Sequence, residues 1–434
     1  MLFRNATLAD GRRRDVRVRG EHIAAVGEEL AVDDGERVVD ATGKRLLPGM
    51  IDVHVHFREP GFPHKETWET GSQSAVAGGV TTVVDQPNTD PPTVDGESFD
   101  RKATLASESL VDYGINGGVT PAWDPYTLFD RPVFALGEVF LADSTGEMGI
   151  ETPLFADALR RAVGPGLPVT VHAEDASLFN DSARERDDPD AWSAYRTADA
   201  EIEAVGRACE LAAERDVRVH VAHTSTPEGI DVAAGAGMTC EVTPHHMFLS
   251  RRDSRELGTF GRMNPPLRRE KRRQEVYDRV AEGTVDVVAT DHAPHTRAGK
   301  DDTIWDAPSG VPGVETALPL LLAEARAGNL SFERVRDLTA ANPAAIFDLP
   351  GKGRIEEGAH ADLVLVDPGK TRTIRGADLH TKADWTPFEG RPGVFPERTL
   401  VRGTVVYERD EDGETFGEAV GENVRVTNGE DADT

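Results

Sequence analysis

The stretch IDVHVHFREPG, residues 51–61, places His54, His56 and Arg58 at alternate positions of an apolar segment. Side chains two residues apart on a β-strand point to the same face, so these three polar groups lie together. A single histidine on a strand is more often a packed core residue than a metal ligand. The pair His54 and His56 leaves both interpretations open, and the rest of the sequence has to decide between them.

Seven more short apolar runs follow, and helix-compatible segments such as AEIEAVGRACELAAERD separate them. Eight strands that alternate with helices are typical of a (β/α)8 TIM-type barrel, an α/β fold of about 250 residues. A doubly wound open sheet would give a similar alternation. The eight runs are MIDVHVHF, VTTVVDQ, YGINGGV, VFALGEVFL, LPVTVHA, VRVHVAHT, MTCEVTP and VDVVATDH.

The two ends of the chain have a different pattern. Segments such as RRRDVRVRGEHIAAVGE near the start and RTLVRGTVVYERDEDG near the end predict short β-hairpins. We expect residues 1–47 and 356–434 to form one small β-sandwich domain, with the catalytic barrel, residues 48–355, between its two halves. Acidic residues concentrate near the C-terminus, and we expect the chain after about residue 410 to be a solvated tail.

The composition excludes some functions. The chain has 77 acidic and 48 basic residues, a formal net charge of −29, whereas a nucleic-acid groove needs the opposite sign. The excess of carboxylates, with lysine scarce relative to arginine, favours a halophilic protein over an ordinary acidic one. No apolar run is long enough for a membrane span and no signal sequence is evident, so we expect a cytoplasmic protein. Cys209 and Cys240 are expected to be buried thiols.

Histidines and one aspartate occur at the ends of several predicted strands. His54 and His56 lie near the end of the first strand, His172 ends the fifth, His223 the sixth and Asp291 the eighth. In a parallel barrel these strand ends converge on the face that carries the active site. Imidazole and carboxylate groups suit Zn²⁺ or a similar divalent ion. Histidine at three separate strand ends therefore predicts a metal site.

Longer motifs carry a family resemblance from Leu47 to about residue 350. The chain resembles the cyclic-amide branch of the amidohydrolase superfamily, and most closely the dihydroorotase family. The resemblance implies a metal-dependent barrel with one or two Zn²⁺ ions, although other divalent ions are possible. The motifs are LPGMIDVHVHFREPGFPHKET, AGGVTTVVDQPNTDPPT, VHAED, VHVAHTSTPEG, EVTPHH, MNPPLR, VATDHAPH and GVPGVETALPLLL.

The resemblance also implies roles for individual residues. The metal ligands would be His54, His56, His172, His223 and Asp291, and Asp291 would also carry the catalytic proton.

Four other residues match positions on the substrate side. Arg58, Asn88 and His295 would bind the substrate carboxylate, with which an arginine can form two parallel hydrogen bonds. Asn264 could assist them or be a turn residue.

The fourth predicted strand departs from the family pattern. Many relatives bridge two metal ions with a carboxylated lysine there, but this chain has no lysine in ALGEVFLADSTGEMGI. Glu138 stands at the expected place and is our preferred bridge, and Asp143 is its rival. Both side chains can point inward only if the strand ends between them. The number of metal ions therefore stays open.

Three more histidines and one loop have two interpretations each. His220 is farther than His223 from the end of its strand, so we expect it to be packed. His245 and His246 could line the pocket or pack in the core. The segment RAGKDDTIWDAPSGVPG, residues 297–313, could close over the substrate or be an ordinary loop.

The reaction implied by the resemblance is the reversible cyclisation of N-carbamoyl-L-aspartate to (S)-dihydroorotate and water, a step of UMP biosynthesis. A metal-bound hydroxide would be the nucleophile in the hydrolytic direction, with Asp291 as general base and then acid. The alternatives are a hydantoinase or allantoinase, or an inactive scaffold for aspartate transcarbamoylase. Arg58 favours a substrate with a free acid group. We expect a homo-oligomer, with a dimer as the candidate form. Association with aspartate transcarbamoylase is a separate candidate interaction.

Overall fold

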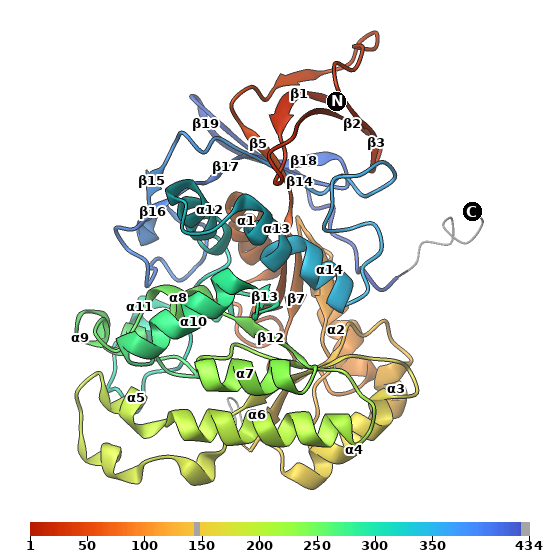
Figure 1. Cartoon of the computed structure of the whole chain (residues 1–434). Helices are drawn as coiled ribbons and strands as arrows, with labels where there is room; N and C mark the ends of the chain where they lie inside the picture. Colours follow the sequence, from red (N-terminus) through yellow and green to blue (C-terminus); the bar gives the residue numbers. More distant parts are fainter. Residues whose placement is uncertain (143–147, 427–434) are drawn as a thin grey trace.

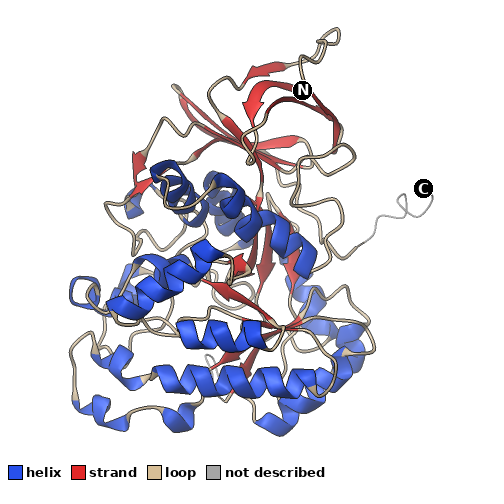
Figure 2. Cartoon of the chain, viewed as in Figure 1, coloured by secondary structure: helices blue, strands red, loops and turns tan. Residues whose placement is uncertain are grey.

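The computed structural model describes residues 1–142 and 148–426. Eight parallel strands coincide with the eight apolar runs and alternate with helices along the chain (Figure 1, Figure 2). These strands are β6 (Met50–Val55), β7 (Val80–Asp85), β8 (Asp112–Ile115), β9 (Leu136–Leu141), β10 (Val169–Ala173), β11 (Val219–Val221), β12 (Thr239–Val242) and β13 (Val287–Val288).

The eight strands close into a barrel. Strands β6, β7 and β8 form one arc, and β9 to β13 form a second arc in sequence order. Parallel bridges join the arcs at both ends, between Gly117 and Leu136 and between Val55 and His292. The predicted (β/α)8 barrel is therefore confirmed, and the open sheet is excluded because an open sheet leaves two unpaired edges.

Helices surround these strands, and several of them begin at side-chain caps that the sequence supplies. Thr67 and Thr70 form a capping box at the start of α1, and Asp95 and Ser98 form another at α2. The longer helices are α1 (Trp68–Gly78), α2 (Gly96–Ala106), α4 (Thr152–Ala162), α6 (Ala198–Ala213), α7 (Pro227–Gly235), α10 (Glu270–Glu282) and α12 (Ala317–Ala327). The shorter ones are α3 (Pro125–Phe129), α5 (Ala191–Tyr195), α8 (Pro244–Phe248), α9 (Ser254–Leu257), α11 (Arg297–Lys300), α13 (Phe332–Arg336) and α14 (Asn342–Ile346). Among the described residues, no helix combines the length and the apolar character that a membrane crossing requires.

Strands from both ends of the chain share one nine-stranded sheet, in the order β19-β18-β17-β14-β5-β1-β2-β3 with β4 paired to β1. The junction is the antiparallel pair of β5 and β14, in which Pro48 faces Leu363. The division into residues 1–47 with 356–434 and residues 48–355 stays a prediction. The strands are β1 (Leu2–Thr7), β2 (Arg13–Arg19), β3 (His22–Gly27), β4 (Val38–Asp40), β5 (Arg45–Pro48), β14 (Leu363–Val366), β17 (Pro396–Val401), β18 (Thr404–Asp410) and β19 (Gly413–Phe416), and a separate pair is β15 (Arg372–Thr373) with β16 (Pro392–Gly393).

The predicted solvated tail is wrong for residues 411–426. Strand β19 pairs with β18, and the acidic cluster RDEDGE is the turn of that hairpin. Farther on, Asn423 forms a bridge with Tyr113 of the barrel, and Arg425 donates a 2.6 Å hydrogen bond to the Phe347 carbonyl. The density of acidic residues alone predicted a solvated tail. In the structure, Arg425 bonds to the barrel and β19 pairs with β18, so the segment is held in place.

His380 connects the sheet to the barrel. Its Nδ1 lies 3.0 Å from Glu315 Oε1, next to α12, and its Nε2 lies 3.1 Å from Glu414 Oε2 on β19. Although burial disfavours the charged ring, the hydrogen bonds to Glu315 and Glu414 raise the pKa of His380 to about 9. The charged imidazole is thus stabilised by two carboxylates from different parts of the fold.

This contact predicts a pH-dependent contribution to stability. An unfolded histidine has a pKa of about 6.5. The stabilisation by charged His380 should therefore be complete below about pH 6.5 and be lost as the pH rises from there through about 9. We expect the difference in melting temperature between the wild type and His380→Gln to shrink across this window. A difference that is constant from pH 6 to pH 10 would contradict the assignment.

Candidate active site

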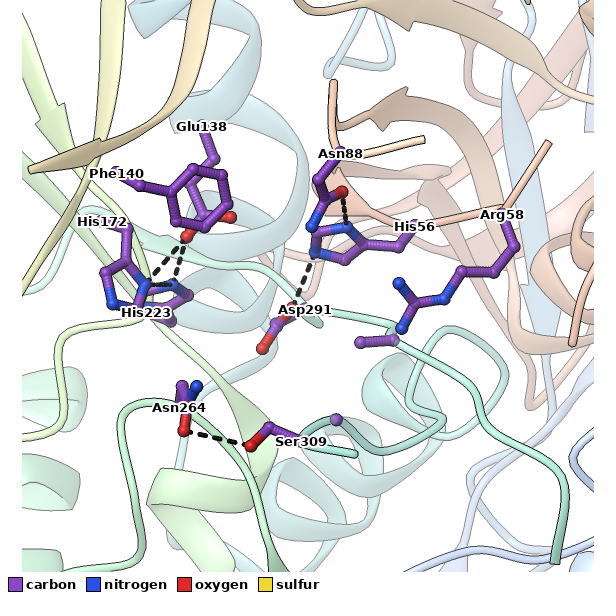
Figure 3. Close-up of a pocket in the computed structure, with 12 residues that line it drawn as sticks. His56, Arg58, Asn88, Glu138, Phe140, His172, His223, Asn264, Asp291 and Ser309 are labelled. Carbon is purple, nitrogen blue, oxygen red and sulfur yellow. Dashed lines mark hydrogen bonds and ion pairs between the residues drawn. The ribbon is translucent and has the colours of Figure 1, made fainter. Parts of the chain in front are cut away.

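Six side chains from five strands converge in one cluster. Five of them line a pocket (Figure 3), and His54 lies behind it. All six are at most 7% exposed. They come from β6, β9 and β10 and from the turns that follow β6, β11 and β13, and they are His54, His56, Glu138, His172, His223 and Asp291. The convergence arises because these parallel strands end on the same face of the barrel.

The ligand atoms of these residues form two overlapping groups. His54, His56 and Asp291 make one group, and His54, Glu138 and His223 make the other, with the atoms of each group within 4.8 Å of one another. His56 Nε2 lies 3.0 Å from Asp291 Oδ1, and His223 Nε2 lies 2.6 Å from Glu138 Oε1. Two overlapping groups could hold one or two ions.

The donor set fits a divalent metal ion. His54 Nε2 is buried and has no hydrogen-bond partner among the described residues, although it lies 3.5 Å from Glu138 Oε2. His172 Nδ1 lies 3.1 Å from His223 Nε2, and both nitrogens face the Glu138 carboxylate. Converging imidazole nitrogens and carboxylate oxygens are the usual environment of Zn²⁺ and related ions.

Acceptors behind the histidines fix their orientation. Glu241 Oε1 lies 2.6 Å from His54 Nδ1, and Asn88 Oδ1 lies 2.7 Å from His56 Nδ1. Each acceptor holds the proton on Nδ1, so Nε2 presents its lone pair to the centre of the cluster. Glu241 was missed in the sequence analysis, although a carboxylate inside the apolar run MTCEV indicates a buried group that needs partners.

The carboxylates of the cluster are ionised. Burial by itself would raise the pKa of Glu138, but the His54 and His223 rings hold it well below its usual range. Burial also opposes the ionisation of Asp291, and the hydrogen bond from His56 together with the His54 ring lowers its pKa nevertheless. The site therefore presents negative oxygen ligands and a ready proton acceptor.

Three pocket residues have a left-handed backbone, which is costly for residues other than glycine. The φ angles are 67° at Arg58, 33° at His223 and 45° at Asp291. Such conformations cost about 1–3 kcal/mol each and concentrate at functional sites. In each case the backbone turns sharply after a strand, with the side chain at the pocket.

Arg58 forms the opposite side of the pocket (Figure 3). Its Nε donates to the Pro294 carbonyl at 3.3 Å, and its Nη2 lies 3.2 Å from His295 Nε2. Within the described part of the chain, no carboxylate oxygen lies within 4.0 Å of its guanidinium nitrogens. Burial lowers the pKa of Arg58 only to about 10, so the group is a buried cation that faces the pocket without an ion-pair partner.

The other predicted substrate residues have different positions. Asn88 and Asn264 line the pocket, and Asn264 Oδ1 accepts a 3.2 Å hydrogen bond from Ser309 Oγ. His295 is next to Arg58 but is absent from the pocket lining. Ser309 was not predicted individually, although it belongs to the predicted loop 297–313.

The remaining histidine candidates lie outside the pocket. His220 bonds to Thr239 and Glu241, in agreement with a packed role. His245 and His246 are buried but do not line the pocket. Asp143 lies outside the described residues, so the choice between Glu138 and Asp143 as the bridge stays a prediction.

Comparison with known proteins agrees with this geometry. Residues 45–406 match the model of the amidohydrolase family. The chain belongs to the amidohydrolase family. It is 63% identical over 98% of its length to a dihydroorotase from Halobacterium salinarum, and the match covers 99% of that protein. An allantoinase from Rubrobacter xylanophilus is 37% identical, with 91% of this chain and 90% of that protein covered.

A solved amidohydrolase structure has the same architecture. The L-hydantoinase (dihydropyrimidinase) from Arthrobacter aurescens superposes with a TM-score of 0.92 at 27% identity, with 97% and 98% of the two chains covered. The predicted resemblance, the barrel and the class of metal-dependent cyclic amidohydrolase are thereby confirmed.

We predict that Glu241→Gln weakens metal binding by about 10- to 100-fold. The reason is that the imidazole of His54, a predicted metal ligand, is no longer held in its orientation by the Glu241 carboxylate. Competition with a chelating dye would measure the affinity for Zn²⁺. Glu315→Gln is the matched control, since Glu315 also accepts from a histidine but lies away from the pocket. Equal affinity in the Glu241 variant and the wild type would disprove the orienting role.

Proposed function

We propose that the chain is a dihydroorotase, which interconverts N-carbamoyl-L-aspartate and (S)-dihydroorotate in pyrimidine biosynthesis. The observation that carries the proposal is the buried Arg58 guanidinium, which has no carboxylate partner in the described protein and faces the imidazole–carboxylate cluster across one pocket. The dihydroorotase from Halobacterium salinarum, 63% identical, supports it.

The metal would be Zn²⁺, as one or two ions per chain. His54, His56 and Asp291 would hold one position, and His172, His223 and Glu138 the other. A divalent ion at this place lowers the pKa of water and polarises a carbonyl oxygen. Glu138 would be the bridging carboxylate, and its contacts with three of the histidines support that role.

Asp291 would carry the proton. Its carboxylate is ionised and lines the pocket between Arg58 and the Glu138 side of the cluster (Figure 3). In hydrolysis it would accept a proton from the attacking water and deliver it to the ring nitrogen that leaves. In ring closure it would take the proton of the attacking carbamoyl nitrogen and return it to the departing water.

Arg58 would bind the carboxylate that remains outside the ring, through two parallel N–H donors. Asn88 and Asn264 would supply polar contacts to the ring from two other sides of the pocket. Burial and the nearby Arg58 lower the pKa of His295, so this ring is neutral and can orient the guanidinium beside it.

The alternatives predict other substrates or none. Hydantoin and allantoin have no free carboxylate for Arg58, although the relative from Rubrobacter xylanophilus is an allantoinase. An inactive scaffold for aspartate transcarbamoylase would not need all six polar groups of the cluster. Homo-oligomer formation, association with that enzyme and a requirement for high salt stay predictions.

We predict that the wild type hydrolyses dihydroorotate and that Arg58→Met raises its KM by at least about tenfold, since a hydrogen bond to a charged group contributes about 1.5–3 kcal/mol. Assays at high salt with dihydroorotate, hydantoin and allantoin would measure this, with metal content as the control. Preference of the wild type for allantoin would disprove the proposed substrate. An unchanged KM in the variant would show that Arg58 does not bind the acid.

We also predict that Glu138→Ala lowers the bound metal per chain, because it removes the carboxylate that faces three histidines. Elemental analysis after dialysis would measure the metal content. Asp143→Ala is the comparison variant and should keep the metal. The opposite result, with loss only in the Asp143 variant, would assign the bridge to Asp143.

A further inference from the structure

A fully buried lysine lies beside the pocket, and no carboxylate of the described residues pairs with it. Lys300, at the end of α11, is 0% exposed. Its Nζ donates to the carbonyls of Arg262 at 3.0 Å, Pro308 at 2.8 Å and Gly310 at 3.0 Å. Burial and the nearby Arg262 and Arg58 guanidinium groups lower its pKa, whereas the three carbonyls engage all three donors of the ammonium form.

The chemistry of this position requires lysine. The chain has only eight lysines among its 48 basic residues. A compact ammonium can point three donors at three converging carbonyls, whereas the planar guanidinium of arginine spreads its donors in one plane. Lysine thus stands here in a chain that uses arginine at most of its basic positions.

The three carbonyls belong to the two segments that form one wall of the pocket. Pro308 and Gly310 flank Ser309, and Arg262 is two residues before Asn264. Ser309, Gly310 and Asn264 line the pocket, and Gly310 N donates to the Arg262 carbonyl at 3.0 Å. Figure 3 shows Asn264 and Ser309 across the pocket from Glu138.

The same wall is connected to Arg58. The Ser309 carbonyl lies 2.9 Å from His295 Nε2, and that nitrogen lies 3.2 Å from Arg58 Nη2. The carbonyl of Ser309 needs the proton on Nε2, so this nitrogen donates to Ser309 and the guanidinium lies beside the ring. A shift of Ser309 therefore affects its own contact with Asn264 and the position of the ring next to Arg58.

We propose that Lys300 is a positioning residue for substrate binding: its ammonium holds the segments 262–264 and 308–310 together as one wall of the pocket. The inference rests on the proposed dihydroorotase function for its kinetic consequence. The loop has other attachments, since Arg262 donates to the Ile304 carbonyl and Thr259 donates to the Lys300 carbonyl. Loss of the ammonium should thus loosen residues 308–310 and leave the barrel folded.

The test compares Lys300→Met, which has no donor, and Lys300→Gln, which keeps two. We expect faster amide hydrogen exchange in peptides that contain residues 262–264 and 306–312, and unchanged exchange in the barrel strands. The KM for dihydroorotate should rise roughly tenfold in Lys300→Met and less in Lys300→Gln, with a smaller change in kcat and with the metal retained, because misplacement by about 1 Å can cost up to about 10²-fold.

Lys352→Met is the matched control. Lys352 is also a buried lysine, but its Nζ donates to Asp112 and Asp362 at 2.7 Å each, outside the pocket. This variant should lose thermal stability and keep the wild-type KM.

Three results would overturn the proposal: unchanged exchange at 306–312, an equal rise of KM in Lys352→Met, or failure of both Lys300 variants to fold. If the wild type does not turn over dihydroorotate, the proposed function fails separately, and the exchange at 306–312 still decides the role of Lys300.

Discussion

One buried carboxylate holds much of the metal cluster in place. Glu241 accepts from His54 Nδ1 and from the backbone N–H of His223 through one oxygen, and from His220 Nε2 through the other. A buried carboxylate without such donors would be strongly destabilising. Because this buried charge needs all its donors, His54 of β6 and His220 of β11 must both lie next to Glu241 of β12. The carboxylate thus fixes the three strands relative to one another. That position brings His54 and His223 toward the same centre.

The buried charges of the pocket are separated by sign. Glu138 and Asp291 lie among the histidines, and Arg58 faces them from the other side, with the Lys300 ammonium behind the wall next to it. In a site of low dielectric these charges act on a substrate more strongly than they would in water. A substrate with a cyclic amide at one end and a carboxylate at the other matches this separation. The electrostatics and the comparisons therefore lead to the same reaction by independent routes.

The sheet built from both termini is tied to the barrel by a buried and a half-buried group of ions. Lys352 joins Asp112 of β8 to Asp362, which precedes β14, and His380 joins Glu414 of β19 to Glu315. These contacts use lysine and histidine to neutralise acids at the junction, whereas the excess of acidic residues gives the whole chain its charge of −29.

The eight barrel strands and the main ligand candidates could be predicted from the sequence because both depend on local rules. The period of two puts His54 and His56 on one face, and the parallel topology brings all strand ends to one rim. The partners of Glu241, the packed place of His220 and the three carbonyls around Lys300 depend on which segments meet after folding. The hairpin of β18 and β19 was missed for the same reason, since its acidic turn has no local sign of its partners. Periodicity encodes which way a side chain points, and only tertiary packing decides what it meets there.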